Sequence, residues 1–213
     1  MSESTTANDE KQTARLEAFS DGVFAIAITL LILELKVPHL PTHDEHATSA
    51  WLCEELLKEW PSYIAFITSF LSVLIMWLHH HAMFRLVKRV NPSLLLANGL
   101  LLLAVSIVPF PTAVVAEYMT TPAASTAAAL YSGSFVFVAL TFVGVVFRAL
   151  RPECLAPDAD PKLVRSFRRG YWIGPPAYGL AMATAPINAW LSMGICTALW
   201  MYWAAMMLPK RAR

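Results

Sequence analysis

A carboxylate stands at the start of a long apolar segment. Asp21 lies in the stretch 15–22, Arg-Leu-Glu-Ala-Phe-Ser-Asp-Gly, and Thr29 is the only polar residue in the segment 23–33 that follows it. A charged group at the edge of a hydrocarbon layer is costly in free energy unless it is paired. Asp21 therefore needs hydrogen-bond donors from another part of the chain.

Suitable donors occur at the ends of two later apolar segments. Three consecutive histidines, residues 79–81, close one of these segments, and Asn98 lies near the start of the next. Imidazole and amide groups can both donate hydrogen bonds, so we expect a network of Ser20, Asp21, a histidine and Asn98. Consecutive residues of a helix point about 100° apart, so the three histidines cannot share one ion, and we expect no metal site.

The composition is that of an integral membrane protein. Of the 213 residues, 57% are hydrophobic and only 15% are charged, which excludes an ordinary soluble protein. A helix of about 20 mostly apolar residues spans a bilayer. We therefore predict an all-α protein forming one domain, 1–213, with six transmembrane helices: 19–37, 61–84, 94–116, 126–148, 170–187 and 188–208.

Basic residues are concentrated on one side of this predicted topology. Of the 16 Lys and Arg residues, all but Lys36 and Lys58 fall at the two termini, after the second span or between the fourth and fifth spans. Basic residues near span ends stay in the cytoplasm, so we predict a multi-pass protein of the plasma (inner) membrane with both termini cytoplasmic. This basic face is expected to meet anionic lipid headgroups and not nucleic acid.

Three segments lie outside the predicted spans. Residues 1–14 are polar and acidic, and we expect them to form a flexible cytoplasmic N-terminus. Residues 38–60 form an extracellular loop whose second half has the apolar spacing of a short amphipathic helix on the outer leaflet. Residues 149–169, rich in Pro, Asp and Arg, form the main cytoplasmic loop.

The first span carries an aliphatic stripe on the side opposite Asp21. At about 100° per residue, five positions share this stripe, with Thr29 on its shoulder: Gly22, Ile26, Leu30, Leu33 and Val37. One interpretation is that the stripe faces lipid or the protein core, as most aliphatic stripes do. The other is that rings of Ile and Leu from several subunits constrict a pore, which can gate by dewetting.

The sequence around Asp21 resembles that of a known family, the prokaryotic relatives of the endosomal and lysosomal potassium channel. Four pieces of sequence over the first three spans carry the resemblance: Arg15-x-x-x-Phe19-Ser20-Asp21-Gly22; Trp77, His80, His81 and Phe84; Asn98; and Pro109-Phe110-Pro111-Thr112. His79 stands where the family tends to carry Asn. The remaining spans resemble the family only in their hydropathy.

The resemblance implies a cation channel, mostly permeable to K⁺, in which four chains surround one axis and the first helix of each lines the path. It implies constrictions at Ile26, Leu30 and Leu33 and a hydroxyl selectivity layer at Thr29. Ala25 stands where some members carry a second hydroxyl, so we expect only a modest preference for K⁺ over Na⁺. The cytoplasmic-side polar network that it implies comprises Arg15, Ser20, Asp21, His80, His81 and Asn98.

Other functions remain open at this point. A proton-coupled secondary transporter would use Asp21 and His80 as its titrating pair. An enzyme is not expected, because no spacing places a nucleophile or metal at depth beside a base. We expect no cofactor, and the partners are permeant K⁺, membrane lipids and three further copies of the chain. Glu34, near the external end of the first span, either concentrates cations at the outer mouth or reaches interfacial water.

Overall fold

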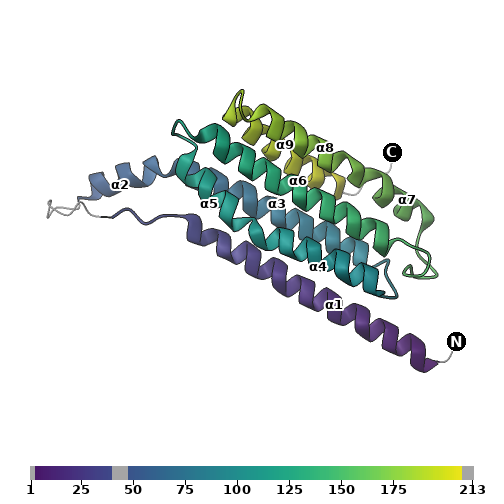
Figure 1. The fold of residues 1–213 in the computed structure, drawn as a ribbon. Helices are drawn as coiled ribbons and strands as arrows, with labels where there is room; N and C mark the ends of the chain where they lie inside the picture. The colour runs from purple at the N-terminus through teal and green to yellow at the C-terminus, as the bar shows by residue number, and fades with distance from the viewer. Residues whose placement is uncertain (1–2, 40–47, 208–213) are drawn as a thin grey trace, which may run out of the picture.

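A computed structural model describes residues 3–39 and 48–207, and the regular elements in these ranges are helices packed into an elongated bundle (Figure 1). The elements are α1 (Glu3–Leu30), η1 (Leu31–Glu34), α2 (Ser49–Lys58), α3 (Trp60–Phe84), α4 (Pro92–Ile107), α5 (Pro109–Tyr118), α6 (Ala124–Ala149), α7 (Pro161–Gly170), η2 (Tyr171–Ile173), α8 (Gly174–Thr184) and α9 (Ala189–Met207). The η elements are short 3-10 helices.

Five helical segments in the described ranges are long and apolar enough to cross a membrane: Asp9–Glu34, Trp60–Phe84, Pro92–Tyr118, Ala124–Ala149 and Ala189–Met207. They correspond to five of the six predicted spans. The remaining prediction, 170–187, coincides with η2 and α8, and α8 has only 11 residues. Pro175 and Pro176 lie in the first turn of α8. Because proline has no N–H group, neither residue can donate a hydrogen bond to the preceding turn, so the regular α-helix begins only here. The count of six is therefore not established by helix length.

Two predicted boundaries differ from the structure for identifiable reasons. α1 begins at Glu3, so the segment 1–14, expected to be flexible, is helical from that residue. Two contacts join this part of α1 to the loop after α3. The Thr13 hydroxyl lies 3.2 Å from the carbonyl oxygen of Lys88, and Arg89 forms an ion pair with Asp9 at 2.8 Å. The third span is divided into α4 and α5 at Pro109, which cannot donate to the preceding turn.

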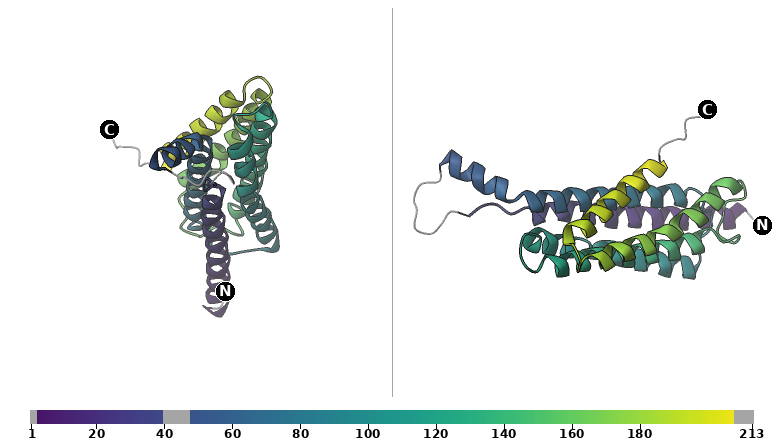
Figure 2. Two further views of the ribbon diagram at one scale, coloured as in Figure 1. Left: turned by 90° about the vertical axis from the view of Figure 1, so that its left-hand side faces the viewer. Right: turned by 90° about the horizontal axis from the view of Figure 1, so that it is seen from above.

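The connections carry two short helices. α2 projects beyond one end of the bundle, within the loop where a short amphipathic helix was expected (Figures 1 and 2). Hydrogen bonds from Lys58 to Glu55 and Glu54 raise the pKa of that lysine. α7 lies in the 149–169 connection and continues to Gly170; its N-cap is Asp160, whose carboxylate accepts the Lys162 N–H at 2.8 Å. The sequence analysis predicted the main cytoplasmic loop here but did not identify this helix.

The core is centred on α6, which packs against α4, α5, α8 and α9, while α9 crosses the bundle obliquely (Figure 2). A buried hydroxyl cluster joins three helices: Ser69 lies 2.8 Å from Thr112 and 3.0 Å from Tyr131. Ser132 and Ser192 make a second such contact at 2.8 Å, between α6 and α9. Hydroxyls at these helix contacts satisfy one another and allow close approach.

Candidate pore helix and its polar anchor

α1 packs against α3 and α4 through one face only. Five positions on this face, including Leu31 at the start of η1, are buried: Thr13, Ser20, Phe24, Ala27 and Leu31. The intervals between them are three, four or seven residues, which are close to one or two turns of a helix, so the five positions share one side. In Figure 1, α1 accordingly lies along one edge of the bundle. Its opposite side is left uncovered by the described part of the chain.

The aliphatic stripe predicted from the sequence occupies this uncovered side. The side chains of Ile26, Leu30 and Leu33 are 61%, 43% and 72% exposed. A Cβ added to Gly22 would meet no atom within 4 Å, so the stripe is also open at its N-terminal end. Thr29 is exposed beside the stripe. The residues assigned to constrictions and selectivity thus share one free surface of one helix.

The hydroxyl of Thr29 is oriented by its own helix. Its Oγ1 lies 3.0 Å from the carbonyl oxygen of Ala25 and 2.9 Å from that of Ile26, so its single proton points to the backbone. The oxygen lone pairs remain available on the exposed side. A hydroxyl held in this way presents the negative end of its dipole outward, which suits a cation and not an anion.

The face of α1 that packs on the bundle is fastened by a fully buried polar triad. Ser20, His80 and Asn98 are each 0% exposed and come from α1, α3 and α4. The Ser20 hydroxyl donates to the carbonyl of Leu16 at 2.8 Å, so it must accept the Asn98 Nδ2–H at 2.9 Å. The amide oxygen of Asn98 then faces His80, whose Nε2 is 2.9 Å away and therefore carries the proton. Three of the predicted network residues are thus brought together.

Asp21 is not part of this triad. Its carboxylate is half-buried and accepts a hydrogen bond from the indole Nε1–H of Trp77 at 2.8 Å. Trp77 belongs to the sequence pattern shared with the family, but the sequence alone did not identify it as the hydrogen-bond donor to Asp21. The available signal was its position one turn before His80 and His81, which places all three toward α1 and α4. The donor that Asp21 requires exists, but it is an indole and not an imidazole.

The remaining predicted network residues have other surroundings. His81 Nδ1 lies 2.9 Å from the carboxylate of Glu17, which forms a second contact between α3 and α1. Arg15 is exposed, and within the described residues it makes no contact with Asp21. The structure divides the predicted network residues among one buried triad, the Asp21–Trp77 hydrogen bond and the His81–Glu17 pair, and it leaves Arg15 outside these contacts. A side chain on the far side of α1 cannot reach the interface that the others share.

The C-terminal end of the candidate pore segment carries both signs of charge. Glu34 closes η1 and is partly buried, and Lys36 follows two residues later. Lys36 forms an ion pair with Glu117 of α5. This contact links the C-terminal end of the segment to the third span, while the polar triad links the middle of α1 to α3 and α4. Whether Glu34 attracts cations stays a prediction.

Comparison with known proteins identifies the family. The family model described as endosomal/lysosomal potassium channel TMEM175 matches residues 15–109. A protein of Chamaesiphon minutus that is named a potassium channel is 45% identical over 199 residues, which is 93% of this chain and 96% of its own length. The chain belongs to the TMEM175 family. The relatives are named as ion channels and not as enzymes, in agreement with the expectation from the sequence.

The fold agrees with this membership. The crystal structure of a lysosomal potassium-selective channel TMEM175 homolog from Chamaesiphon minutus has a TM-score of 0.81 and 44% identity, over 92% of this chain and 98% of that one. A Gallus gallus relative, named an endosomal/lysosomal proton channel TMEM175, is 34% identical over 106 residues, which is 49% of this chain and 21% of that protein. This chain is thus an all-helical membrane protein with the TMEM175 channel fold.

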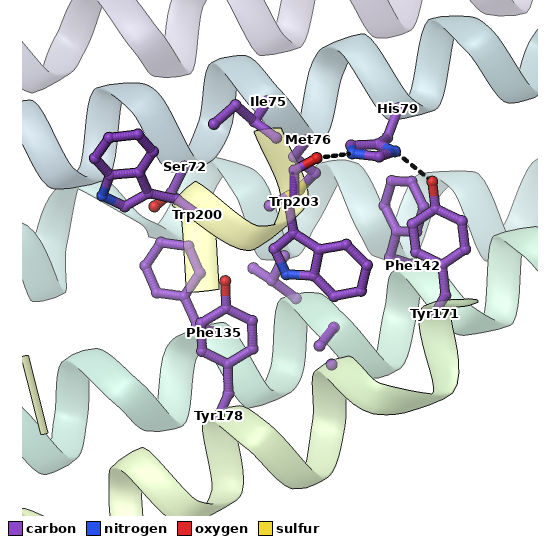
Figure 3. A pocket seen from close by; sticks show the side chains of 13 residues that line it. Ser72, Ile75, Met76, His79, Phe135, Phe142, Tyr171, Tyr178, Trp200 and Trp203 are labelled. Atoms are coloured by element: carbon purple, nitrogen blue, oxygen red, sulfur yellow. Dashed lines mark hydrogen bonds between the residues drawn. The ribbon is translucent and has the colours of Figure 1, made fainter. Parts of the chain in front are cut away.

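This member of the TMEM175 family has a further polar contact away from α1. His79 Nε2 lies 3.0 Å from the carbonyl oxygen of Trp203 and therefore donates to it, while Nδ1 accepts the Tyr171 hydroxyl at 2.5 Å (Figure 3). These side chains border a mostly aromatic cavity of about 60 Å³ between α3, α6, α8 and α9. The three adjacent histidines thus contact three different parts of the bundle.

Proposed function

We propose that this chain forms a potassium-permeable, leak-like cation channel whose pore is lined by α1 of each copy. The observation that carries the proposal is the division of α1 into two faces. Buried polar groups fasten one face to α3 and α4, and the opposite face exposes Ile26, Thr29, Leu30 and Leu33. An apolar stripe opposite a rigid anchor is suited to meet copies of itself around an axis.

In this proposal four copies assemble in the plasma membrane with both termini cytoplasmic. Rings of Ile26, Leu30 and Leu33 form an apolar neck, in which wetting controls conduction. Such a neck cannot replace the hydration shell of an ion, so discrimination must come from nearby dipoles. The Thr29 oxygens are oriented to supply them. A modest preference for K⁺ over Na⁺ follows, because K⁺ loses water more readily.

The competing transporter mechanism would need Asp21 and His80 to titrate as a pair. Asp21 is bonded to Trp77, and His80 is bonded to Asn98. Each of the two groups is therefore hydrogen-bonded to a different partner, and neither of these bonds joins them. The geometry therefore favours the channel.

The decisive experiment is flux through the purified protein in liposomes. We expect K⁺ efflux down its gradient, discrete single-channel steps in planar bilayers, and a smaller Na⁺ current. A proton-sensitive dye measured in parallel distinguishes a K⁺ channel from a proton pathway. Transport that saturates, shows no steps and requires a proton gradient would overturn the proposal.

The Thr29→Ala variant tests the selectivity layer. We expect the reversal potential under bi-ionic K⁺/Na⁺ conditions to move toward zero, because the variant removes the outward oxygen dipoles. Thr141→Ala is a matched control, since Thr141 makes the same pair of contacts to backbone carbonyls on α6, with Phe137 and Val138. If both variants leave the reversal potential unchanged, Thr29 is not part of the filter.

A further inference from the structure

A groove opens at the other side of the bundle from α1, near the C-terminal ends of α3, α7 and α9. It encloses about 430 Å³, which is within the range of small-ligand sites. Its walls are apolar side chains of α7 and α9, and its polar lining groups include Arg85 and Ser166. His79 and Tyr171 line both this groove and the aromatic cavity, so the two spaces adjoin at this pair, whose hydrogen bond is drawn in Figure 3.

The cation in the groove has no carboxylate partner among the described residues. Arg85 is exposed and makes none of the ion pairs found in that part of the chain. The same holds for three basic residues on the adjoining α7: Lys162, Arg165 and Arg169. A guanidinium is well suited to bind a phosphate through two parallel hydrogen bonds. This end of the bundle thus carries positive charge that the described chain does not neutralise.

The apolar walls beside this cation are also left exposed by residues 3–39 and 48–207. Leu163 on α7 is 43% exposed, and Met206 and Met207 on α9 are 40% and 37% exposed. A free anion would neutralise the arginine but would leave these side chains in contact with solvent. An amphiphile satisfies both requirements at once, because its headgroup meets the cation and its hydrocarbon covers the walls.

We propose that this groove is a binding site for an anionic glycerophospholipid, with its phosphate on Arg85 and an acyl chain along the apolar walls. The orientation of the site rests on the proposed function, which places the ends of α3 and α7 at the cytoplasmic face. That leaflet is rich in anionic lipids, which attract basic segments at the membrane edge. If α1 lines the pore, the groove faces the surrounding lipid, because α8 and α9 lie across the bundle from α1 (Figure 1).

The site can be tested by lipid binding to the full chain in detergent, without measuring transport. The protein is titrated with phosphatidylglycerol or with phosphatidylcholine of the same acyl chains, and bound molecules are counted by native mass spectrometry. Inorganic phosphate is added in a parallel titration as a competitor. We expect phosphatidylglycerol to bind at least about fivefold more tightly than phosphatidylcholine, since one basic residue near an anionic lipid supplies about that factor. Inorganic phosphate should not compete.

Two variants and one control localise the binding. Arg85→Gln should weaken phosphatidylglycerol binding about fivefold, and Ser166→Trp, which fills the groove but keeps the charge, should weaken it more. Arg165→Gln removes the same charge from an exposed position of α7 outside the groove lining, so it should change binding less than about twofold.

Three results would overturn the assignment. Equal weakening by Arg165→Gln and Arg85→Gln would mean diffuse attraction to a basic surface. Full retention of binding in Ser166→Trp would place the lipid elsewhere. Displacement of the lipid by inorganic phosphate would identify a simple anion site. A channel that conducts normally but fails these tests would leave the proposed function intact, so the two proposals fail separately.

Discussion

The polar triad that fastens α1 gives the most quantitative prediction. Asn98→Leu keeps an apolar side chain of similar size at a position that is 0% exposed, but it removes both interhelical hydrogen bonds, to Ser20 and His80. Ser20 remains bonded to the carbonyl of Leu16. His80 has no replacement, because its other ring nitrogen is already buried without a partner. The loss therefore falls mainly on the imidazole.

The expected cost follows from these contacts. Hydrogen bonds between membrane helices contribute about 0.6 kcal/mol on average and rarely more than about 1.7 kcal/mol, because the unfolded chain in a bilayer also finds partners. Two bonds give about 1.2 kcal/mol, and a buried imidazole without a partner adds about 1 kcal/mol or more. We expect a destabilisation of about 2 kcal/mol, which is a change of about thirtyfold in the folding equilibrium.

Unfolding in mixed detergent micelles, followed by circular dichroism, measures this difference. Ser20→Ala should cost less, and the double variant should show a coupling energy of about 0.6 kcal/mol. Ser106→Ala is the control, since that hydroxyl lies exposed on the same helix and bonds only to its own Leu102 carbonyl. A cost for Asn98→Leu below about 0.5 kcal/mol, or strictly additive effects, would refute the anchoring role.

Three further predictions concern α1 and the buried thiol of Cys154. Ile26→Ala should widen the neck and raise single-channel conductance, and unchanged unitary current would remove Ile26 from the constriction. Asp21→Ala leaves the Trp77 indole without its acceptor, so this variant should lower the thermal stability of the purified protein. Asp21→Asn retains an oxygen that can accept the same hydrogen bond, so it should preserve most of that stability. Burial raises the pKa of the Cys154 thiol, so less of it is thiolate near neutral pH. Alkylation of Cys154 should therefore be slow near neutral pH and should accelerate as the pH rises. The exposed Cys53 should react first. Equal labelling rates, read by mass spectrometry, would contradict that burial.

The lengths and faces of the membrane helices were largely predictable from the sequence. Apolar runs located five spans, and helical periodicity alone identified the stripe that the structure leaves exposed on α1. The span predicted at 170–187 stays a prediction, because its helical residues are divided between η2 and the 11-residue α8. The sequence analysis missed α7, because a short basic amphipathic helix has too little apolar sequence to be read as a membrane segment.

The candidate site was predicted in its membership but not in its pairing. Ser20, His80 and Asn98 were expected together and do meet, because each requires a partner in an apolar environment. The same argument could not select Trp77 for Asp21, since both an indole and an imidazole can donate. That choice depends on how α3 is rotated against α1.

The sequence by itself determined that this is a membrane protein, where five of its long apolar helices lie, which family it resembles and which stripe of the first helix is smooth and apolar. These properties are local, because hydropathy and helical periodicity are set by neighbours along the chain. Only the tertiary structure decided which donor holds Asp21, where each histidine points, and that Arg85 shares a groove with α7 and α9. Those outcomes depend on the rotation and crossing of helices distant in sequence, which side-chain packing fixes and which no single segment encodes.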